Sequence, residues 1–343
     1  MDYRTLGNTG LFVSRLCLGA MTFGGRNTPP FDSVGGLDLP QTKTIVDGAI
    51  DAGINFIDTA NVYAGGQSET LLGQSIKTKR NNLILATKFH SRIGPGPNQV
   101  GQSRVHMMEA LEGSLRRLQT DYIDLYQIHS FDSLTSFDEV LRALEDAVRQ
   151  GKIRYIGCSN LAAWQIMKAL GISDKRNLSS FVSVQAYYSL AGRDIEHELI
   201  PMIKNQNLGL LVWSPLSGGF LSGKYNRHSE QGISRRDKID FPPINHEKTY
   251  DIIDTLVTIG KKHNVSAAQV ALAWLIAKAE VTSIIVGARN IHQLKDNVNA
   301  LKVILSEEEI LELNRISDTG LRYPEWIQKG DILQRLPSPN QPL

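Results

Sequence analysis

The sequence predicts an α/β fold, a (β/α)8 barrel of the TIM type with an N-terminal β-hairpin and long loops at the C-terminal face. Short apolar or β-branched runs alternate with longer segments of helical periodicity, and a helix follows each predicted strand. Eight such units form a parallel sheet that is covered on one side and can close on itself. A doubly wound open sheet is the competing fold, but LCLGAMTFGG lacks the G-x-G-x-x-G turn that usually follows its first strand.

The predicted elements follow one another from the N-terminus. Two short apolar stretches flank the turn-forming Asn8-Thr9-Gly10, which indicates a β-hairpin. Barrel strands are expected at 16–19, 54–58, 83–88, 122–129, 153–159, 181–185, 208–214 and 283–287. Helices are expected at 41–52, 67–77, 104–117, 137–150, 161–171, 195–206, 249–263 and 290–299, with 266–278 as a second part of the seventh helical layer. We expect one domain over 1–343, with the barrel at about 15–302 and a C-terminal helix and tail at 306–343.

Two insertions interrupt this alternation, and each follows the C-terminal end of a predicted strand. Residues 24–40 are rich in Gly and Pro, and residues 215–248 are polar in their middle. Barrel active sites are built at this face, and loops of this length are usually lids or binding loops. From residue 318 on we expect a loosely structured tail, with Tyr323 and Trp326 folded over the same face.

The composition is that of an ordinary globular protein, with 41% hydrophobic and 21% charged residues and a net charge of +2. This balance favours neither nucleic acid nor a membrane as partner. The N-terminus lacks a signal-peptide pattern and no apolar run is long enough to span a bilayer, so a cytoplasmic protein is expected. Cys17 and Cys158 lie in apolar stretches and are interpreted as buried free thiols, and no zinc-type motif predicts a metal.

Polar side chains stand at the ends of three consecutive predicted strands. Asp58 ends the second strand, Lys88 the third and His129 the fourth, and Tyr63 follows Asp58 by five residues. Taken singly, each has an ordinary explanation, as a helix cap, a solvated charge, a satisfied histidine or a loop residue. Together at one barrel mouth they must satisfy one another or serve chemistry.

Carbonyl reduction is the chemistry that this set suits. A carbonyl oxygen that gains charge during reduction needs a proton and a dipole directed at it. The phenol of Tyr63 titrates near pH 10, and Lys88 is the cation that can lower its pKa. Asp58 can keep Lys88 charged, and a neutral His129 can donate a hydrogen bond to the carbonyl oxygen.

The chain resembles the aldo-keto reductase superfamily over residues 3 to 317. INFIDTANVYAGGQSETLLG is similar to the family's GxxxxDTAxxYGxxE signature, with Ala64 where many members have Gly, and LATK, LYQIH and IRYIGCSN follow in the family's order. The resemblance implies that Asp58, Tyr63, Lys88 and His129 are the catalytic tetrad. The long loop after strand seven and the GAR-x3-Q-x3-N ending resemble bacterial and fungal members, a group that includes aryl-alcohol dehydrogenase-like enzymes and potassium-channel β subunits.

The resemblance also implies an NADP site. Its residues would be Gly19, Met21, Asp58, Ser159, Asn160, Gln185, Trp213, Ser214, Leu216, Gly219, Lys224, Gly287, Arg289, Gln293 and Asn297. Independently of the resemblance, a loop that leads from the eighth strand into a helix is a frequent phosphate site in barrels. Arg289 in that loop offers bidentate geometry to a phosphate, which favours NADP over NAD.

The function expected is NADPH-dependent reduction of an aldehyde or ketone, reversible toward alcohol oxidation, with a small carbonyl or alcohol as partner. The alternative is a cofactor-binding, redox-sensing regulatory subunit like the channel β subunits, because such subunits retain the tetrad. A hydrolase or aldolase with a Schiff-base Lys88 is less favoured, since Asp58 would keep this lysine protonated. An aromatic rim of the substrate pocket is expected from Phe23, Phe89, His90, Phe131 and Trp213.

Overall fold

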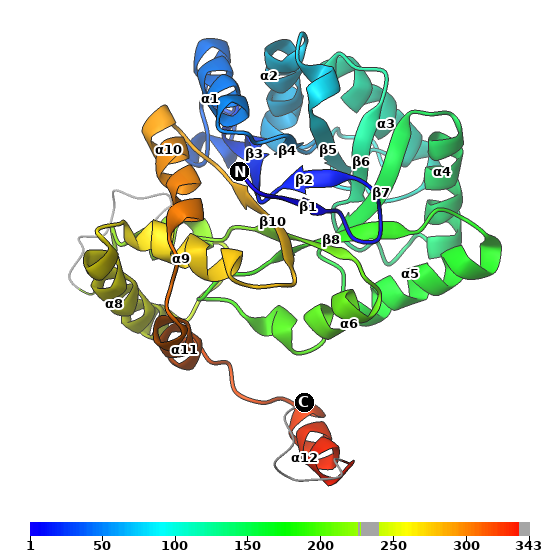
Figure 1. Ribbon diagram of the computed structural model, residues 1–343. Coiled ribbons are helices and arrows are strands. Elements are labelled where there is room, and N and C mark those ends of the chain that lie inside the picture. Colours follow the sequence, from blue (N-terminus) through cyan, green and yellow to red (C-terminus); the bar gives the residue numbers. More distant parts are fainter. Residues whose placement is uncertain (226, 228–239, 336–343) are drawn as a thin grey trace.

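The computed structural model describes residues 1–225, 227 and 240–335 and confirms the predicted barrel (Figure 1). Its strands are β3 (Leu16–Gly19), β4 (Phe56–Asp58), β5 (Ile84–Phe89), β6 (Ile123–Ile128), β7 (Ile153–Ser159), β8 (Phe181–Tyr187), β9 (Gly209–Trp213) and β10 (Val281–Val286). All neighbours pair in parallel, and β10 pairs with β3 to close the ring, with Ile285 opposite Cys17. All C-terminal strand ends therefore meet at one mouth.

The predicted hairpin is also confirmed, and it plugs the opposite end of the barrel. Strands β1 (Tyr3–Thr5) and β2 (Phe12–Ser14) pair antiparallel. Leu6 and Val13 of this hairpin are fully buried and join the apolar cluster that fills the barrel interior. The hairpin thus closes the N-terminal end, and the C-terminal mouth remains for a site.

Helices surround the sheet as an outer ring (Figure 1). They are α1 (Leu39–Asp51), α2 (Gln67–Ile76), α3 (Arg104–Leu118), α4 (Phe137–Arg149), α5 (Ala163–Arg176), α6 (Leu199–Asn205), α8 (His246–His263), α9 (Ala267–Ile276) and α10 (Ile291–Asn299). Several begin at serine caps, and Ser103, Ser136 and Ser266 each accept a hydrogen bond from a backbone N–H in the first turn. The main core lies between this ring and the outward-facing side chains of the strands.

Two predicted segments differ from the structure. The helix expected at 195–206 is split into a short 3-10 turn (Asp194–Glu196) and α6, because Pro201 lacks the N–H of a helix interior and fits only the first turn. The tail after 318 was predicted to be loosely structured, which is wrong for α12 (Glu325–Arg335), and residues 336–343 lie outside the described part.

The C-terminal segment does not cover the mouth as expected. Figure 1 shows α12 standing away from the barrel, beyond α11 (Glu307–Ile316). Tyr323 is 75% exposed and Trp326 55% exposed, so neither packs over the site. Polar contacts hold the start of this segment: Arg322 pairs with Asp194 in the loop after β8, which leaves the aromatic side chains facing solvent.

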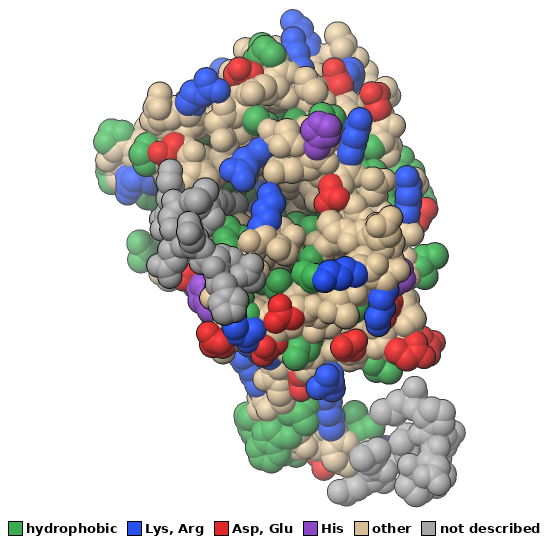
Figure 2. Space-filling view, turned by 90° about the vertical axis from the view of Figure 1, so that its left-hand side faces the viewer, with side chains coloured by type: hydrophobic (Ala, Val, Ile, Leu, Met, Phe, Trp, Pro, Cys, Tyr) green, Lys and Arg blue, Asp and Glu red, His purple; other side chains and the backbone are tan. Residues whose placement is uncertain are grey.

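The surface carries no single-sign field on the face shown in Figure 2, where acidic and basic side chains are intermixed. This agrees with the net charge of +2. Among the residues that the structure describes, none of the helices combines the length and the apolar character that a bilayer crossing requires.

Candidate active site

The four predicted tetrad residues come together at the C-terminal mouth. Asp58 is the last residue of β4, and Lys88 lies on the neighbouring strand β5. Tyr63 begins a 3-10 turn (Tyr63–Gly66) that follows β4, and His129 comes directly after β6. Parallel pairing of β4, β5 and β6 keeps these strand ends adjacent, so three neighbouring strands supply the whole group.

Lys88 is fully buried, and each hydrogen of its ammonium group has an acceptor. Its Nζ donates to Asp58 Oδ2 at 2.6 Å, to the Thr59 carbonyl at 2.9 Å and to the Tyr63 hydroxyl at 3.4 Å. Burial alone would lower the pKa of Lys88, but the neighbouring Asp58 and Tyr63 outweigh burial and raise it. Lys88 is therefore a cation, which is wrong for a Schiff-base nucleophile.

The phenol of Tyr63 is under opposing influences. Burial raises the pKa of Tyr63 above its ordinary value, while Lys88 acts in the opposite direction and lowers it. The prediction that Lys88 lowers this pKa is right for the contribution of Lys88, but wrong for the net shift, which is upward. The sequence shows which cation is near, whereas the loss of water around the ring depends on the folded packing.

His129 is a neutral imidazole beside Tyr63. The two rings meet edge to face with centroids 5.8 Å apart. Burial first, and then the charges of Lys88 and His90, lower the pKa of His129 to about 3. Its Nδ1 is buried without a hydrogen-bond partner among the described residues. His129 also lines a cavity at the C-terminal mouth of the barrel. A neutral ring can donate one hydrogen bond to a carbonyl oxygen in that cavity, as predicted.

The second oxygen of Asp58 accepts two hydrogen bonds from amide side chains. Gln127 Nε2 donates to Asp58 Oδ1 at 3.0 Å, and Gln185 Nε2 donates to the same atom at 2.9 Å. Gln185 was predicted to bind the NADP cofactor, whereas Gln127 was missed. A signal for Gln127 existed, because strand periodicity places residues two apart on one face, here Gln127 with His129.

The turn after Tyr63 carries unusual backbone angles. Ala64, Gly65 and Gly66 all have positive φ, at 52°, 61° and 89°. Gly adopts this region readily, but a left-handed Ala costs about 1 kcal/mol. Ala64 therefore stands in a strained backbone position where many members of the resembling family have Gly.

A cavity of about 920 Å³ opens beside the tetrad. Every residue predicted to bind NADP lines it: Gly19, Met21, Asp58, Ser159, Asn160, Gln185, Trp213, Ser214, Leu216, Gly219, Lys224, Gly287, Arg289, Gln293 and Asn297. Lining residues that the sequence did not indicate include Thr22, Tyr225, Phe241, Ser266, His292 and Asp296. The volume is in the range of cofactor sites.

The loop after β9 lines this cavity with Ser214, Leu216, Gly218 and Gly219. Ser214, Ser217, Gly218 and Gly219 all have positive φ, between 51° and 94°. The Ser214 hydroxyl accepts a hydrogen bond from the Gly218 N–H at 2.9 Å, which fixes the turn. The N–H groups of Ser217 and Gly219 donate to the Ser214 and Leu216 carbonyls, both at 2.9 Å, so these backbone groups hold the shape of the turn.

The other end of the cavity lies at the start of α10. Asn290 caps this helix by accepting from the Gln293 N–H, and the Gln293 side chain accepts from the Arg289 N–H at 2.9 Å. The Arg289 side chain is exposed, and no acidic residue in the described part of the chain forms an ion pair with it. A helix N-terminus beside an unpaired guanidinium suits a phosphate group.

At the tetrad end, hydrogen bonds hold three of the predicted cofactor residues, Ser159, Asn160 and Trp213, in the cavity wall. Ser159 Oγ donates to the Gln185 carbonyl at 3.0 Å, and Asn160 Nδ2 donates to the His129 carbonyl at 2.9 Å. The Trp213 indole N–H donates to Asn160 Oδ1 at 3.1 Å. These bonds brace the cavity wall around His129 and set the orientation of Trp213.

The predicted aromatic rim is largely wrong. Phe23 and Phe89 are fully buried in the core, and Phe89 stacks on Tyr126 at 5.0 Å. Phe89 follows the inward-facing Lys88, so strand alternation turns it outward toward the helices. Of the predicted rim, Trp213 lines the cavity. Its ring stacks on that of Phe241, which was not predicted, with centroids 5.6 Å apart. His90 and Phe131 are partly buried outside the cavity lining.

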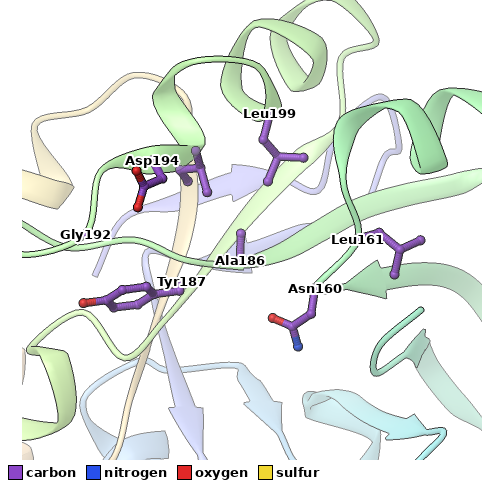
Figure 3. Close-up of a pocket in the computed structure, with 8 residues that line it drawn as sticks. Asn160, Leu161, Ala186, Tyr187, Gly192, Asp194 and Leu199 are labelled. Carbon is purple, nitrogen blue, oxygen red and sulfur yellow. The ribbon is translucent and has the colours of Figure 1, made fainter. Parts of the chain in front are cut away.

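Figure 3 shows the residues that line a second, smaller cleft of about 200 Å³. Asn160 lines both spaces, and Asp194 and Leu199 come from the segment after β8. Within the described ranges, His, Cys, Asp and Glu side chains do not gather in threes as a metal site requires.

Comparison with known proteins identifies the class to which this fold and site belong. The profile of the aldo/keto reductase family matches residues 15–318, and the chain belongs to this family of oxidoreductases. It is 40% identical over 329 residues to "Uncharacterized oxidoreductase YrpG" of Bacillus subtilis, covering 92% of this chain and 96% of the relative. It is 35% identical over 313 residues to "Probable voltage-gated potassium channel subunit beta" of Arabidopsis thaliana, covering 89% and 92%. It is 32% identical over 325 residues to norsolorinic acid reductase of Aspergillus flavus, covering 92% and 81%. These relatives confirm the predicted resemblance.

Proposed function

We propose that the protein reduces an aldehyde or ketone with NADPH and catalyses the reverse oxidation of the alcohol. One observation carries the proposal: the cavity that gathers every predicted cofactor residue also borders Asp58, Tyr63 and His129, with Lys88 directly behind them. The test is oxidation of NADPH on addition of a panel of aldehydes and ketones, followed by absorbance. No turnover with any carbonyl would contradict the proposal.

The residues present suit an NADP cofactor. The loop Ser214–Gly219 together with Lys224 would hold the pyrophosphate, Arg289 the 2′-phosphate, and Ser159, Asn160 and Gln185 the carboxamide. Gln185 fits this role because its amide nitrogen is engaged by Asp58, which leaves its oxygen to accept from a carboxamide. When bound, the reduced nicotinamide supplies the hydride for the carbonyl carbon.

Side chains of the protein orient the carbonyl oxygen and protonate it. Neutral His129 donates a hydrogen bond that orients the oxygen, and Tyr63 gives it a proton. The ammonium of Lys88, 3.4 Å from the phenol, stabilises the phenolate that remains. Asp58 holds Lys88 in place and charged through the 2.6 Å ion pair.

The two directions of the reaction should respond oppositely to pH. Reduction needs protonated Tyr63, and because the pKa values of Tyr63 and Lys88 are both raised, kcat for reduction should stay level through neutrality and fall only at alkaline pH. The pKa of His129 is lowered to about 3, so this ring adds no acid limb in the ordinary range. Alcohol oxidation needs the phenolate, and its kcat should rise with pH. Profiles between about pH 5 and about pH 10 test this, and a fall in reduction through neutrality would contradict it.

Arg289 should decide the choice between NADPH and NADH. Arg289→Ala removes the charged donor proposed for the 2′-phosphate, so the Kd for NADPH should rise about tenfold or more while that for NADH changes little. Quenching of intrinsic fluorescence by each cofactor measures both constants, because Trp213 lines the cavity. Lys295→Ala, a substitution of an exposed cation on the same helix α10 that does not line the cavity, is the control. Equal weakening of both cofactors by Arg289→Ala would remove Arg289 from the phosphate site.

A regulatory role is the second candidate function, favoured by the 35% identity to a protein named as a potassium channel β subunit. A cofactor-binding subunit of this kind would retain the tetrad and the cavity. Co-purification of a stoichiometric partner, together with negligible turnover of carbonyls, would support this role. Turnover by the isolated chain favours the reductase.

A further inference from the structure

A buried glutamine inside the barrel bonds directly to the tetrad. Gln127 lies on β6, is fully buried, and donates its Nε2 hydrogen to Asp58 Oδ1 at 3.0 Å. Lys88 occupies the other oxygen, Asp58 Oδ2. Gln127 does not line the cavity that would hold cofactor and substrate, so it can influence the reaction only through neighbours, of which Asp58 belongs to the tetrad.

The Gln127 amide is held in one orientation. Gln185 Nε2 donates to Gln127 Oε1 at 3.3 Å and to Asp58 Oδ1 at 2.9 Å. If the Gln127 amide turned over, its oxygen would face the Asp58 carboxylate and its NH₂ group would face the NH₂ group of Gln185. Both contacts are repulsive, so the donor is fixed on Asp58.

This donor affects how strongly Asp58 attracts Lys88. The Lys88 ammonium is shared between Asp58 Oδ2 at 2.6 Å and the Tyr63 hydroxyl at 3.4 Å. Two amide hydrogens on Oδ1 take up part of the carboxylate's charge and fix its plane, which leaves more of the ammonium's field for the phenol. With one donor removed, Asp58 would hold Lys88 more strongly and Tyr63 would be a weaker acid.

We propose that Gln127 is a positioning residue that acts through Asp58 and Lys88 to keep Tyr63 an effective proton donor. The inference rests on the proposed reductase function. The titratable groups that face Asp58 are Lys88 from β5, Tyr63 from the following turn and Cys17 from β3. Burial raises the pKa of the Cys17 thiol well above its ordinary value, so the thiol stays neutral, and the pH response is left to Lys88 and Tyr63.

Gln127→Met tests the inference, because it keeps the side-chain length and removes the donor. The expected result is a kcat for reduction lowered about tenfold, with the KM for the carbonyl and the Kd for NADPH changed less than about twofold. The pH at which alcohol oxidation reaches half its maximal rate should move upward, since the phenol becomes harder to ionise. If Gln127 had only a structural role, Gln127→Met would lower the stability of the protein without moving this pH.

Thr87→Val is the matched control. The Thr87 hydroxyl donates at 2.6 Å to Glu69, a fully buried carboxylate that is ion-paired with Arg117. Thr87 lies on β5, next to the strand of Gln127, and the substitution removes its neutral donor from a buried, paired carboxylate on helix α2, outside the tetrad. It should lower stability and leave the pH profile of kcat unchanged.

Gln127→Glu keeps the inference testable if the Met variant fails to fold. A second carboxyl beside Asp58 shares a proton with it at acidic pH and can then donate as the amide does. Activity should approach that of the wild type at acidic pH and fall as this proton is lost. If either variant kept the wild-type pH profile of kcat while Tyr63→Phe was inactive, the role of Gln127 would be overturned and the proposed function would stand. A wild type without any carbonyl turnover would overturn the proposed function, and this inference with it.

Discussion

Tyr63→Phe is expected to lower kcat for carbonyl reduction by a factor of about 10² to 10⁴, because it removes the proton donor and little else. The phenyl ring keeps its contacts with His129 and Phe31, whose centroids lie 5.8 and 6.2 Å away. Lys88 loses only its longest hydrogen bond, at 3.4 Å, and keeps Asp58 and Thr59. The Kd for NADPH and the thermal midpoint should therefore change little, which steady-state kinetics, fluorescence titration and calorimetry can measure.

Tyr126→Phe is the matched control for this substitution. Tyr126 is a fully buried tyrosine on β6, and within the described residues its hydroxyl has no hydrogen-bond partner. Removal of this hydroxyl should leave kcat unchanged. If instead Tyr63→Phe turned over every accepted aldehyde at the wild-type rate, the proton donor would be a different group.

Lys88→Met is expected to abolish turnover and also to destabilise the protein. Asp58 would remain as a buried carboxylate without its cation, and loss of one partner of a buried ion pair typically costs about 3–5 kcal/mol. Both partners are almost fully buried, so solvent does not screen their interaction. Urea unfolding gives the stability change, and NADPH oxidation gives the rate.

The double variant Asp58→Asn with Lys88→Met separates stability from catalysis. Without either charge no uncompensated carboxylate remains, so the double variant should be more stable than Lys88→Met alone. It should still be inactive, because no cation stabilises the phenolate of Tyr63. A Lys88→Met protein as stable as the wild type, or an active double variant, would contradict the role given to the pair.

The barrel and the tetrad could be predicted because local patterns determine both. Each strand is a short apolar run between turn residues, and parallel pairing then brings Asp58, Lys88 and His129 to one mouth without further information. Tyr63 follows because only four residues separate it from Asp58. The cavity residues depended on the family resemblance, since positions such as Gln293 and Asn297 carry no chemical signal of their own.

Packing across the barrel could not be predicted in the same way. Gln127 and Gln185 lie on different strands and meet at Asp58 only after the ring closes. Phe89 was misplaced because its outward direction depends on the phase of β5, which Lys88 sets. The direction of the Tyr63 pKa shift depends on how completely the folded protein excludes water from the phenol.

Transfer of deuterium tests the central claim most directly. The protein would be incubated with an accepted aldehyde and NADPH that carries deuterium in both positions of the reactive carbon of the nicotinamide ring, and the alcohol would be analysed by mass spectrometry. We predict one deuterium on the carbinol carbon of the alcohol, and almost none formed by Tyr63→Phe in the same time. An alcohol that carries no deuterium, or an alcohol labelled at the carbinol carbon when unlabelled NADPH is used in deuterated water, would contradict direct reduction at the mouth of this barrel.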